Sequence, residues 1–245
     1  MQTRPVTAEV ETPRPSSTVV LVRQGVDLPE VYMVKRHARA SFGAAYAFPG
    51  GVLDRADSEV HAMCDGLSAE SANRILEVGE GGLDYYSAAV RELFEESGVL
   101  LADTRLSRAD LEQARLKLND GSLAWDVLVG QNDIRMRCDQ LHYVGFWITP
   151  REMAKRYSAR FFLAQLPDGQ RASHCGGEIT DSCWISAPDV LAASKAGDMR
   201  VFYPTRKTLQ SIADLDSVPA IRAWADSVAE AGVVCERPSF ARGTC

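Results

Sequence analysis

The sequence predicts a mixed α/β or α+β fold, and two kinds of segment in it support this class. Short apolar, β-branched runs such as STVVLVRQG and LHYVGFWITP are typical of buried strands. Amphipathic runs typical of helices, such as SRADLEQARLKLND, lie between and after them. No internal repeat is visible, so we expect one domain over residues 17–232, between a flexible N-terminal arm (1–16) and a C-terminal tail (233–245).

The composition limits the classes of partner. The chain has 245 residues, of which 46% are hydrophobic and 24% charged, with a formal net charge of −6. An acidic protein has no general attraction to nucleic acid or anionic lipid, so we expect neither partner. No stretch approaches the roughly 20 apolar residues of a membrane span. An anionic substrate must therefore be received by a local basic patch or by metal ions.

The cysteines and the N-terminal sequence indicate a reducing compartment. Six cysteines and four histidines are scattered without a CxxC pair or another zinc-ligand spacing. The first 17 residues contain no apolar run of the kind found in a secretory signal. We therefore predict reduced thiols and a cytoplasmic location.

The first half of the domain begins with a predicted hairpin. Strands at 17–25 and 30–37 flank GVDLP, whose residues favour a turn. A structured loop, SFGAAYAFPGGVLD, follows at 41–54. A polar segment over 54–83 then contains a predicted helix behind an N-cap at Ser68, and GEGGL ends it. The next helix is predicted to run from an N-cap at Asp84 through Ser97, with Gly98 as a left-handed C-cap.

The second half alternates helices and strands. Amphipathic segments at 107–120 and 123–132 predict two helices. Strands are expected at 141–150, 159–167 and 181–187, and a helix follows behind Pro188. The stretch from 203 to 232 reads as two further helices divided by DSVP.

One helical segment, RELFEESGV at 91–99, concentrates negative charge. At 100° per residue, Glu92, Glu95 and Glu96 fall within an arc of roughly 100°. This arc borders the apolar stripe that would face the core, which places the carboxylates at the rim of a cleft. The helix alone leaves two interpretations open: a solvated acidic face, or a site for a hard divalent cation such as Mg²⁺, which prefers oxygen ligands.

The upstream loop FPGG (48–51) favours the second interpretation. Its two adjacent glycines suit a tight turn or the close approach of a ligand. Together, the loop and the helix resemble the box of the Nudix hydrolases, a glycine and a spaced glutamate followed by Arg-Glu-aliphatic-x-Glu-Glu-x-Gly-aliphatic. The second half is filled by Arg91, Glu92, Leu93, Glu95, Glu96, Gly98 and Val99.

The first half of the box departs from the family pattern. Gly51 precedes Arg91 by 40 positions, against 14 in the uninterrupted box, so 26 extra residues intervene. Counting forward from Gly51 places the family glutamate at Asp57, and counting back from Arg91 places it at Leu83; Asp57 is the better candidate. An insertion here resembles the subgroup of nucleoside diphosphate-linked moiety X motif 19, whose members are linked to hydrolysis of the coenzyme A diphosphate.

The resemblance implies a fold and a metal site. The expected fold is an α/β/α sandwich around a mixed sheet, with an insertion inside the box (about 54–83) and extra C-terminal helices. Glu92 and Glu96 would be the principal ligands of Mg²⁺ or Mn²⁺, with Glu95 sharing the metals and taking part in catalysis. Arg91 would orient a neighbouring carboxylate. A base or further ligand is expected outside the box; Glu178 is the candidate and Asp181 the reserve, although Glu178 could equally be an exposed loop residue.

The expected reaction is hydrolysis of a nucleoside diphosphate-linked small molecule. Arg36 and Arg39 are candidates for phosphate contacts, because arginine can bind phosphate through two nitrogens. Phe48, Gly50 and Gly51 complete the predicted substrate-binding set. Coenzyme A or an acyl derivative is the first candidate, and ADP-ribose or a dinucleotide is the alternative. A Nudix module that binds a nucleotide without cleaving it is the competing class of function, and monomer and homodimer both stay open.

Overall fold

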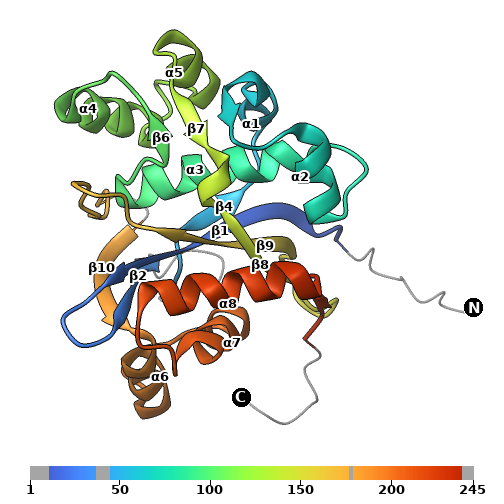
Figure 1. Cartoon of the computed structure of the whole chain (residues 1–245), viewed down its shortest axis with the longest axis vertical. Coiled ribbons are helices and arrows are strands. Elements are labelled where there is room, and N and C mark those ends of the chain that lie inside the picture. Colours follow the sequence, from blue (N-terminus) through green and yellow to red (C-terminus); the bar gives the residue numbers. More distant parts are fainter. Residues whose placement is uncertain (1–10, 37–44, 177–178, 239–245) are drawn as a thin grey trace, which may run out of the picture.

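The computed structural model describes residues 11–36, 45–176 and 179–238. A large sheet lies between two layers of helices, one containing α3 and the other containing α6, α7 and α8 (Figure 1). The α/β class and the sandwich architecture expected from the sequence are confirmed. None of the helices in these ranges has the length and apolarity that a bilayer crossing requires.

The main sheet is mixed. Its strands run in the order β10-β2-β1-β9-β8-β11, with β3 attached to β2 and β4 attached to β1. Strand β1 pairs antiparallel with β2, as the predicted hairpin requires, and parallel with β9. The bounds are Arg14–Gln24 (β1), Pro29–Arg36 (β2), Tyr46–Ala47 (β3), Gly50–Val52 (β4), His142–Ile148 (β8), Tyr157–Gln165 (β9), Ile179–Ser186 (β10) and Cys235–Glu236 (β11).

The apolar run of β1 is buried on both faces of the sheet. Val19 and Leu21 belong to the core on the α3 side, whereas Val20 and Val22 belong to the core on the α6–α8 side. Alternate residues of a strand point to opposite faces, so a sheet covered on both sides needs an unbroken apolar run. This is why the VVLV stretch shows no alternation of polar and apolar residues.

The FPGG loop lies where β1 and β2 diverge. Strand β3 pairs with the end of β2 at Val34↔Ala47, and β4 pairs with β1 at Thr18↔Gly50. This pairing requires glycine at position 50, because a Cβ atom there would clash with β1, only 2.7 Å from the Cα of Thr18. The described part of the predicted structured loop, residues 45–54, is thus fixed to two strands of the sheet.

The α3 layer also contains the two helices of the insertion, α1 and α2. The bounds of the helices in this layer are Arg55–Ser58 (α1), Ala69–Leu76 (α2), Gly82–Ser97 (α3), Arg108–Asn119 (α4) and Trp125–Gln131 (α5). Ser68 caps α2 and Ser107 caps α4 with their side chains, and the first of these caps confirms the prediction. A small second sheet, β5-β7-β6, joins Cys64–Asp65, Arg135–Arg137 and Ala102–Asp103.

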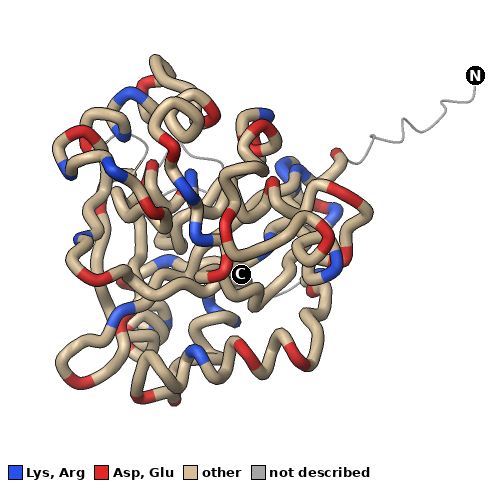
Figure 2. The backbone as a smooth tube through the Cα atoms, turned by 45° about the horizontal axis from the view of Figure 1, so that its top comes forward, with Lys and Arg blue, Asp and Glu red and all other residues tan. Residues whose placement is uncertain are grey.

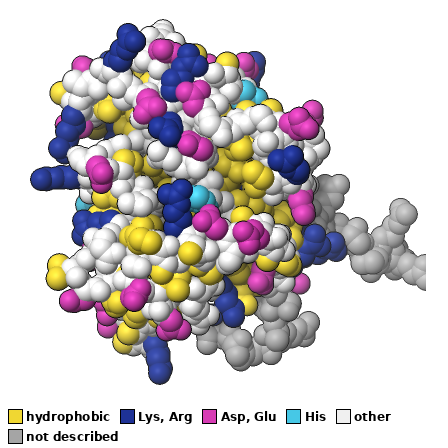
Figure 3. Space-filling view, viewed as in Figure 1, with side chains coloured by type: hydrophobic (Ala, Val, Ile, Leu, Met, Phe, Trp, Pro, Cys, Tyr) yellow, Lys and Arg dark blue, Asp and Glu magenta, His cyan; other side chains and the backbone are white. Residues whose placement is uncertain are grey.

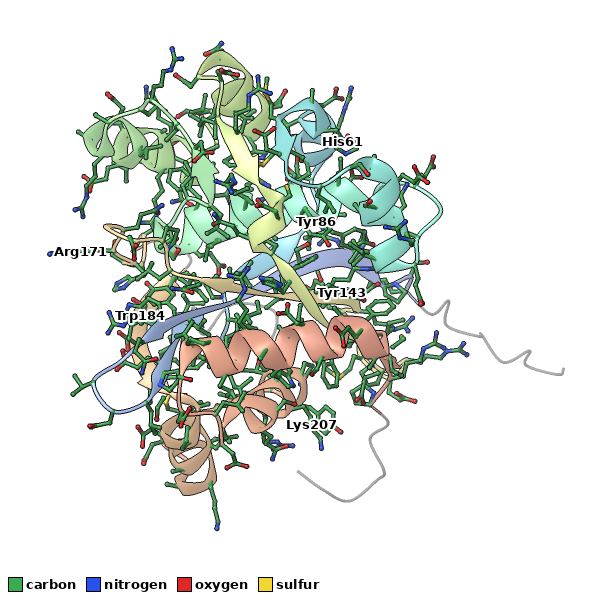
Figure 4. All side chains as sticks on the ribbon, in the orientation of Figure 1. His61, Tyr86, Tyr143, Arg171, Trp184 and Lys207 are labelled. Atoms are coloured by element: carbon green, nitrogen blue, oxygen red, sulfur yellow. The ribbon has the colours of Figure 1, made fainter. Side chains whose placement is uncertain are left out.

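The opposite layer consists of the last three helices. They are α6 (Ala187–Ala196), α7 (Tyr203–Ile212) and α8 (Val218–Ala231). The predicted division of the last two by DSVP is confirmed, since the Ser217 side chain caps α8 and Pro219 lies in its first turn. Lys207, on α7, lies in this layer, across the sheet from α3 (Figure 4).

Three predicted boundaries are wrong. The predicted C-terminal tail, 233–245, contains β11, which pairs with β8 of the main sheet. Strand β1 begins at Arg14, inside the predicted arm, because Arg14–Ser16 pair with β9. Helix α3 begins at Gly82 behind Gly81, so Asp84 is not its N-cap. The Asn73 side chain accepts a hydrogen bond from the Gly82 N–H at 2.7 Å, and Asp84 instead faces His61 at 2.5 Å. Both partners come from the insertion, so the helix start depends on tertiary contacts.

Candidate active site

Helix α3 carries the acidic arc beside a buried face, as predicted. Tyr86, Ala89, Val90 and Leu93 are at most 2% exposed. Tyr86 on α3 and Tyr143 on β8 both pack against Phe162, with ring centroids 4.9 and 5.8 Å away, between the helix and the sheet (Figure 4). This packing fixes the rotation of α3 about its axis. The orientation of Glu92, Glu95 and Glu96 relative to the sheet is therefore fixed as well.

The acidic arc meets the glycine turn directly. The Gly50 N–H donates to the Glu96 carboxylate at 3.0 Å, and Glu96 is 6% exposed. A Cβ atom on Gly51 would overlap the Glu92 carboxylate. Position 51 therefore needs glycine because a glutamate side chain occupies the space beside it. Residues 46 positions apart in the sequence form one site.

Arg91 is held by a buried network that crosses the insertion. Its guanidinium donates to both carboxylate oxygens of Asp57, at 3.0 and 2.9 Å, and to the Val52 carbonyl at 3.0 Å. Asp57 is fully buried and also accepts from the Ser87 hydroxyl, which in turn accepts from the Trp125 indole N–H. The aspartate that follows Gly51 by six positions thus binds the box arginine, although 33 residues separate the two.

The same arginine touches the acidic arc. Arg91 donates to Glu92 at 2.8 Å and lies 3.6 Å from Glu95. Burial by itself lowers the pKa of Arg91, but the hydrogen bonds and charge of Asp57 and the charges of Glu92 and Glu95 raise it above its usual value. Arg91 is therefore a permanent cation that orients the Glu92 carboxylate.

Burial and neighbouring carboxylates dominate the electrostatic surroundings of Glu95. Burial, followed by the charges of Glu92 and Asp57, raises the pKa of Glu95 to about 7, although Arg91 acts in the opposite direction. Crowded, partly buried carboxylates resist ionisation unless a cation stabilises them. The arc therefore has the electrostatic character of a cation site.

The donor set fits a hard divalent cation. Glu92, Glu95 and Glu96 supply only oxygen atoms, the ligands that Mg²⁺ and Mn²⁺ prefer. In the described part of the chain, no three acidic, histidine or cysteine side chains are gathered in a ready-made metal cluster. Glu92 is turned toward Arg91 and Glu96 toward Gly50. A carboxylate offers about four lone-pair positions, so these contacts are compatible with metal binding.

Some of the remaining predicted site residues lie outside the described ranges, and the others make contacts that can be described. Arg39 and Glu178 lie outside the described residues, and Arg36 ends β2, where only its backbone is described. The Phe48 side chain is 2% exposed and packs edge-on against Phe161, at a centroid distance of 6.3 Å. The buried side chain of Phe48 is not available for the predicted substrate contact; it packs in the core on the α6–α8 side of the sheet. Asp181 accepts a hydrogen bond from the Tyr46 hydroxyl at 3.1 Å.

In the described part of the chain, charged residues of the two signs are mixed. Basic and acidic positions are interspersed along the backbone (Figure 2), and charged side chains of both signs are scattered over the face seen in Figure 3. A cavity of about 440 Å³ lies among residues of β8, β9 and α8, including His142, Gln165 and Arg222. It contains none of the residues predicted from the sequence, so it is separate from the acidic arc.

Comparison with known proteins agrees with the site. The family model described as the NUDT19 Nudix domain matches residues 81–212, more than half of the chain. The chain belongs to the NUDT19 Nudix domain family. The matched range contains the Arg91–Val99 segment, together with α4, α5 and the strands from β7 to β10.

Two individual proteins show how much of the chain is similar to known Nudix proteins in sequence and in fold. "Putative nudix hydrolase 7" of Caenorhabditis elegans is 27% identical over 172 residues, which are 68% of this chain and 50% of that protein. The chain thus spans about half the length of this curated relative. The crystal structure of a NUDIX hydrolase from Alicyclobacillus acidocaldarius covers 88% of this chain and 97% of its own, with a TM-score of 0.73 and 21% identity. This second likeness shows the shared fold.

Asp57, Ser87 and Trp125 show what the sequence revealed and what it missed. Counting six positions from Gly51 singled out Asp57, but nothing in the pattern indicated that its partner is Arg91. Ser87 and Trp125 were not predicted to belong to the site. Their contacts join three separate elements, α1, α3 and α5, so no local sequence signal marks them.

Proposed function

We propose that this Nudix family member hydrolyses the diphosphate of a nucleoside diphosphate-linked small molecule, with the help of Mg²⁺ or Mn²⁺. The observation that carries the proposal is the meeting of the acidic arc with the 50–51 turn, where Glu96 accepts from the Gly50 N–H. Three crowded carboxylates favour a bound cation, and a bound cation would in turn attract an anionic diphosphate. The family match supports the same reaction class.

Each group of the site has a task in this reaction. Glu92, Glu95 and Glu96 would hold the cation, which when bound supplies neutralisation of the diphosphate charge and activation of water. Arg91, fixed by Asp57, keeps Glu92 in place. Gly50 fixes one oxygen of Glu96. Glu178 stays our candidate for the base or for a further ligand.

Coenzyme A or an acyl-coenzyme A is the first substrate candidate. The family match to the NUDT19 Nudix domain supports it, together with Arg36 and Arg39 ahead of the FPGG turn. ADP-ribose and dinucleotides are the second candidates. A panel of coenzyme A, ADP-ribose, NADH and diadenosine polyphosphates, assayed with Mg²⁺ and with Mn²⁺, ranks them by kcat/KM. We place the reaction in the cytoplasm.

Substitution of Glu96 tests the proposed activity. Glu96→Gln keeps the shape of the side chain but removes its charge, so we expect kcat/KM on the best substrate to fall about 100-fold or more. Glu230→Gln, at an exposed position of α8 in the opposite layer, is the control and should retain wild-type turnover. Unchanged turnover in Glu96→Gln rejects the metal role of this residue. A wild-type protein that binds the nucleotides without cleaving them supports the non-catalytic class instead.

A further inference from the structure

A buried arginine outside the box holds the last turn of α3. Arg115, on α4, is 9% exposed. Its Nε donates to the backbone carbonyl of Glu95 at 3.0 Å, and one terminal nitrogen donates to the carbonyl of Ser173 at 2.7 Å. The guanidinium therefore joins the box helix to the segment that follows β9.

Further contacts strengthen the same junction. Asn119, one turn along α4, donates from its side chain to the Glu95 carbonyl at 3.3 Å. The Ser173 N–H donates to the carbonyl of Ser97, the last residue of α3, at 2.8 Å. Gln170 donates to the Leu100 carbonyl and accepts from its N–H, at 2.8 and 2.9 Å. The carbonyls at the end of a helix have no partners within the helix, and here they are bound from outside.

The hydrogen bonds of the Arg115 guanidinium go to backbone carbonyls. In the ranges that the structure describes, Arg115 forms no ion pair. A cation at a helix C-terminus interacts favourably with the partial negative charge there. Arg115 thus adds a buried positive charge at the turn that bears Glu95 and Glu96.

We propose that Arg115 is a positioning residue for the metal-binding carboxylates Glu95 and Glu96. This inference rests on the proposed function. Helix ends fray, and Glu96 lies only one residue before the end of α3 at Ser97. Metal ligands must be held in a narrow range of orientations, and the partners that hold them strongly affect metal affinity. Arg115 supplies this support from outside the box.

Arg160 provides a matched control. It is also a buried arginine, 4% exposed, and it also donates to a carbonyl at the end of a helix, that of Leu76 in α2, at 2.9 Å. Its guanidinium lies between the rings of Tyr85 and Phe146. The contacts that the structure describes for the Arg160 side chain are with Leu76, Tyr85 and Phe146, all away from the acidic arc. Loss of a buried arginine in general can therefore be separated from loss of Arg115.

The test compares Arg115→Lys with Arg160→Lys in the full chain. Mn²⁺ binding is measured by electron paramagnetic resonance, so the readout does not depend on turnover, and thermal midpoints are recorded in parallel. We expect the Mn²⁺ dissociation constant to rise about tenfold or more in Arg115→Lys and less than twofold in Arg160→Lys. Asn119→Ala removes the longer hydrogen bond to the Glu95 carbonyl. It should also raise the Mn²⁺ dissociation constant, but by a smaller factor than Arg115→Lys.

The possible failures are distinguishable. If the wild-type chain binds Mn²⁺ but Arg115→Lys and Arg160→Lys change the affinity equally, or not at all, the positioning role is rejected and the proposed function stands. If the wild-type chain itself binds no Mn²⁺, both the proposed function and the role of Arg115 are rejected. A lower thermal midpoint in both variants with altered Mn²⁺ affinity in Arg115→Lys alone supports the inference.

Discussion

Asp57 supports the acidic arc indirectly, because it binds Arg91, which in turn binds Glu92. It is fully buried, and its two carboxylate oxygens bind the guanidinium of Arg91, which is itself nearly buried. Two charges taken out of water in this way are stable only as a pair, because either one alone would be buried without compensation. The insertion between Gly51 and Arg91 therefore preserves the contact while it lengthens the chain between them.

Removal of this carboxylate should be costly. Asp57→Asn leaves Arg91 as a buried cation without its main partner, and we expect a loss of about 3 kcal/mol or more in the free energy of unfolding. Asp103→Asn is the control, because Asp103 is 71% exposed and lies 3.5 Å from Arg137; its loss should stay below about 1 kcal/mol. Urea titration of both variants measures the difference. If both variants lose the same free energy of unfolding, the Asp57–Arg91 pair does not stabilise the fold as proposed.

At the scale of elements, α3 and its two ends show how far sequence patterns reach. The C-cap at Gly98 was predicted and is confirmed, with φ of 73°. The start at Asp84 was wrong because Gly81 and Asn73, a partner from the insertion, set the helix start. The small sheet of β5, β6 and β7 was not predicted, since each strand has only two or three residues and their partners lie far apart in the sequence. Long apolar or amphipathic runs can be predicted as strands or helices from the local sequence. Strands of two or three residues cannot, because they depend on distant pairing partners.

Gly98 should be needed for two separable reasons. Gly98 and Gly121 both have left-handed backbones, with φ of 73° and 75°. A Cβ on Gly98 would lie 2.8 Å from a terminal nitrogen of Arg115, whereas a Cβ on Gly121 would meet nothing within 4 Å. We expect Gly121→Ala to cost about 1 kcal/mol from backbone strain alone. Gly98→Ala should cost more and should also weaken Mn²⁺ binding; equal stability losses with unchanged Mn²⁺ binding would contradict this account.

At the scale of the whole molecule, the sheet brings the two halves of the box together. The FPGG turn is tied to β1 and β2, and α3 packs on the same sheet, so Gly50 and Glu96 meet across the insertion. The layered fold and the acidic arc followed from sequence pattern and family resemblance. The Asp57–Arg91–Ser87–Trp125 network and the Arg115 junction did not, because they depend on side chains from elements that only the fold brings together.

The central claim is that divalent ions bind between the acidic arc and the 50–51 turn. The most direct test is a crystal structure of the full chain grown with Mn²⁺, in which anomalous scattering locates the metal. The account predicts Mn²⁺ bound by carboxylates of Glu92, Glu95 and Glu96, next to Gly50 and Gly51. Carboxylates that point into solvent without metal, or Mn²⁺ bound only in the cavity near His142 and Arg222, would contradict it.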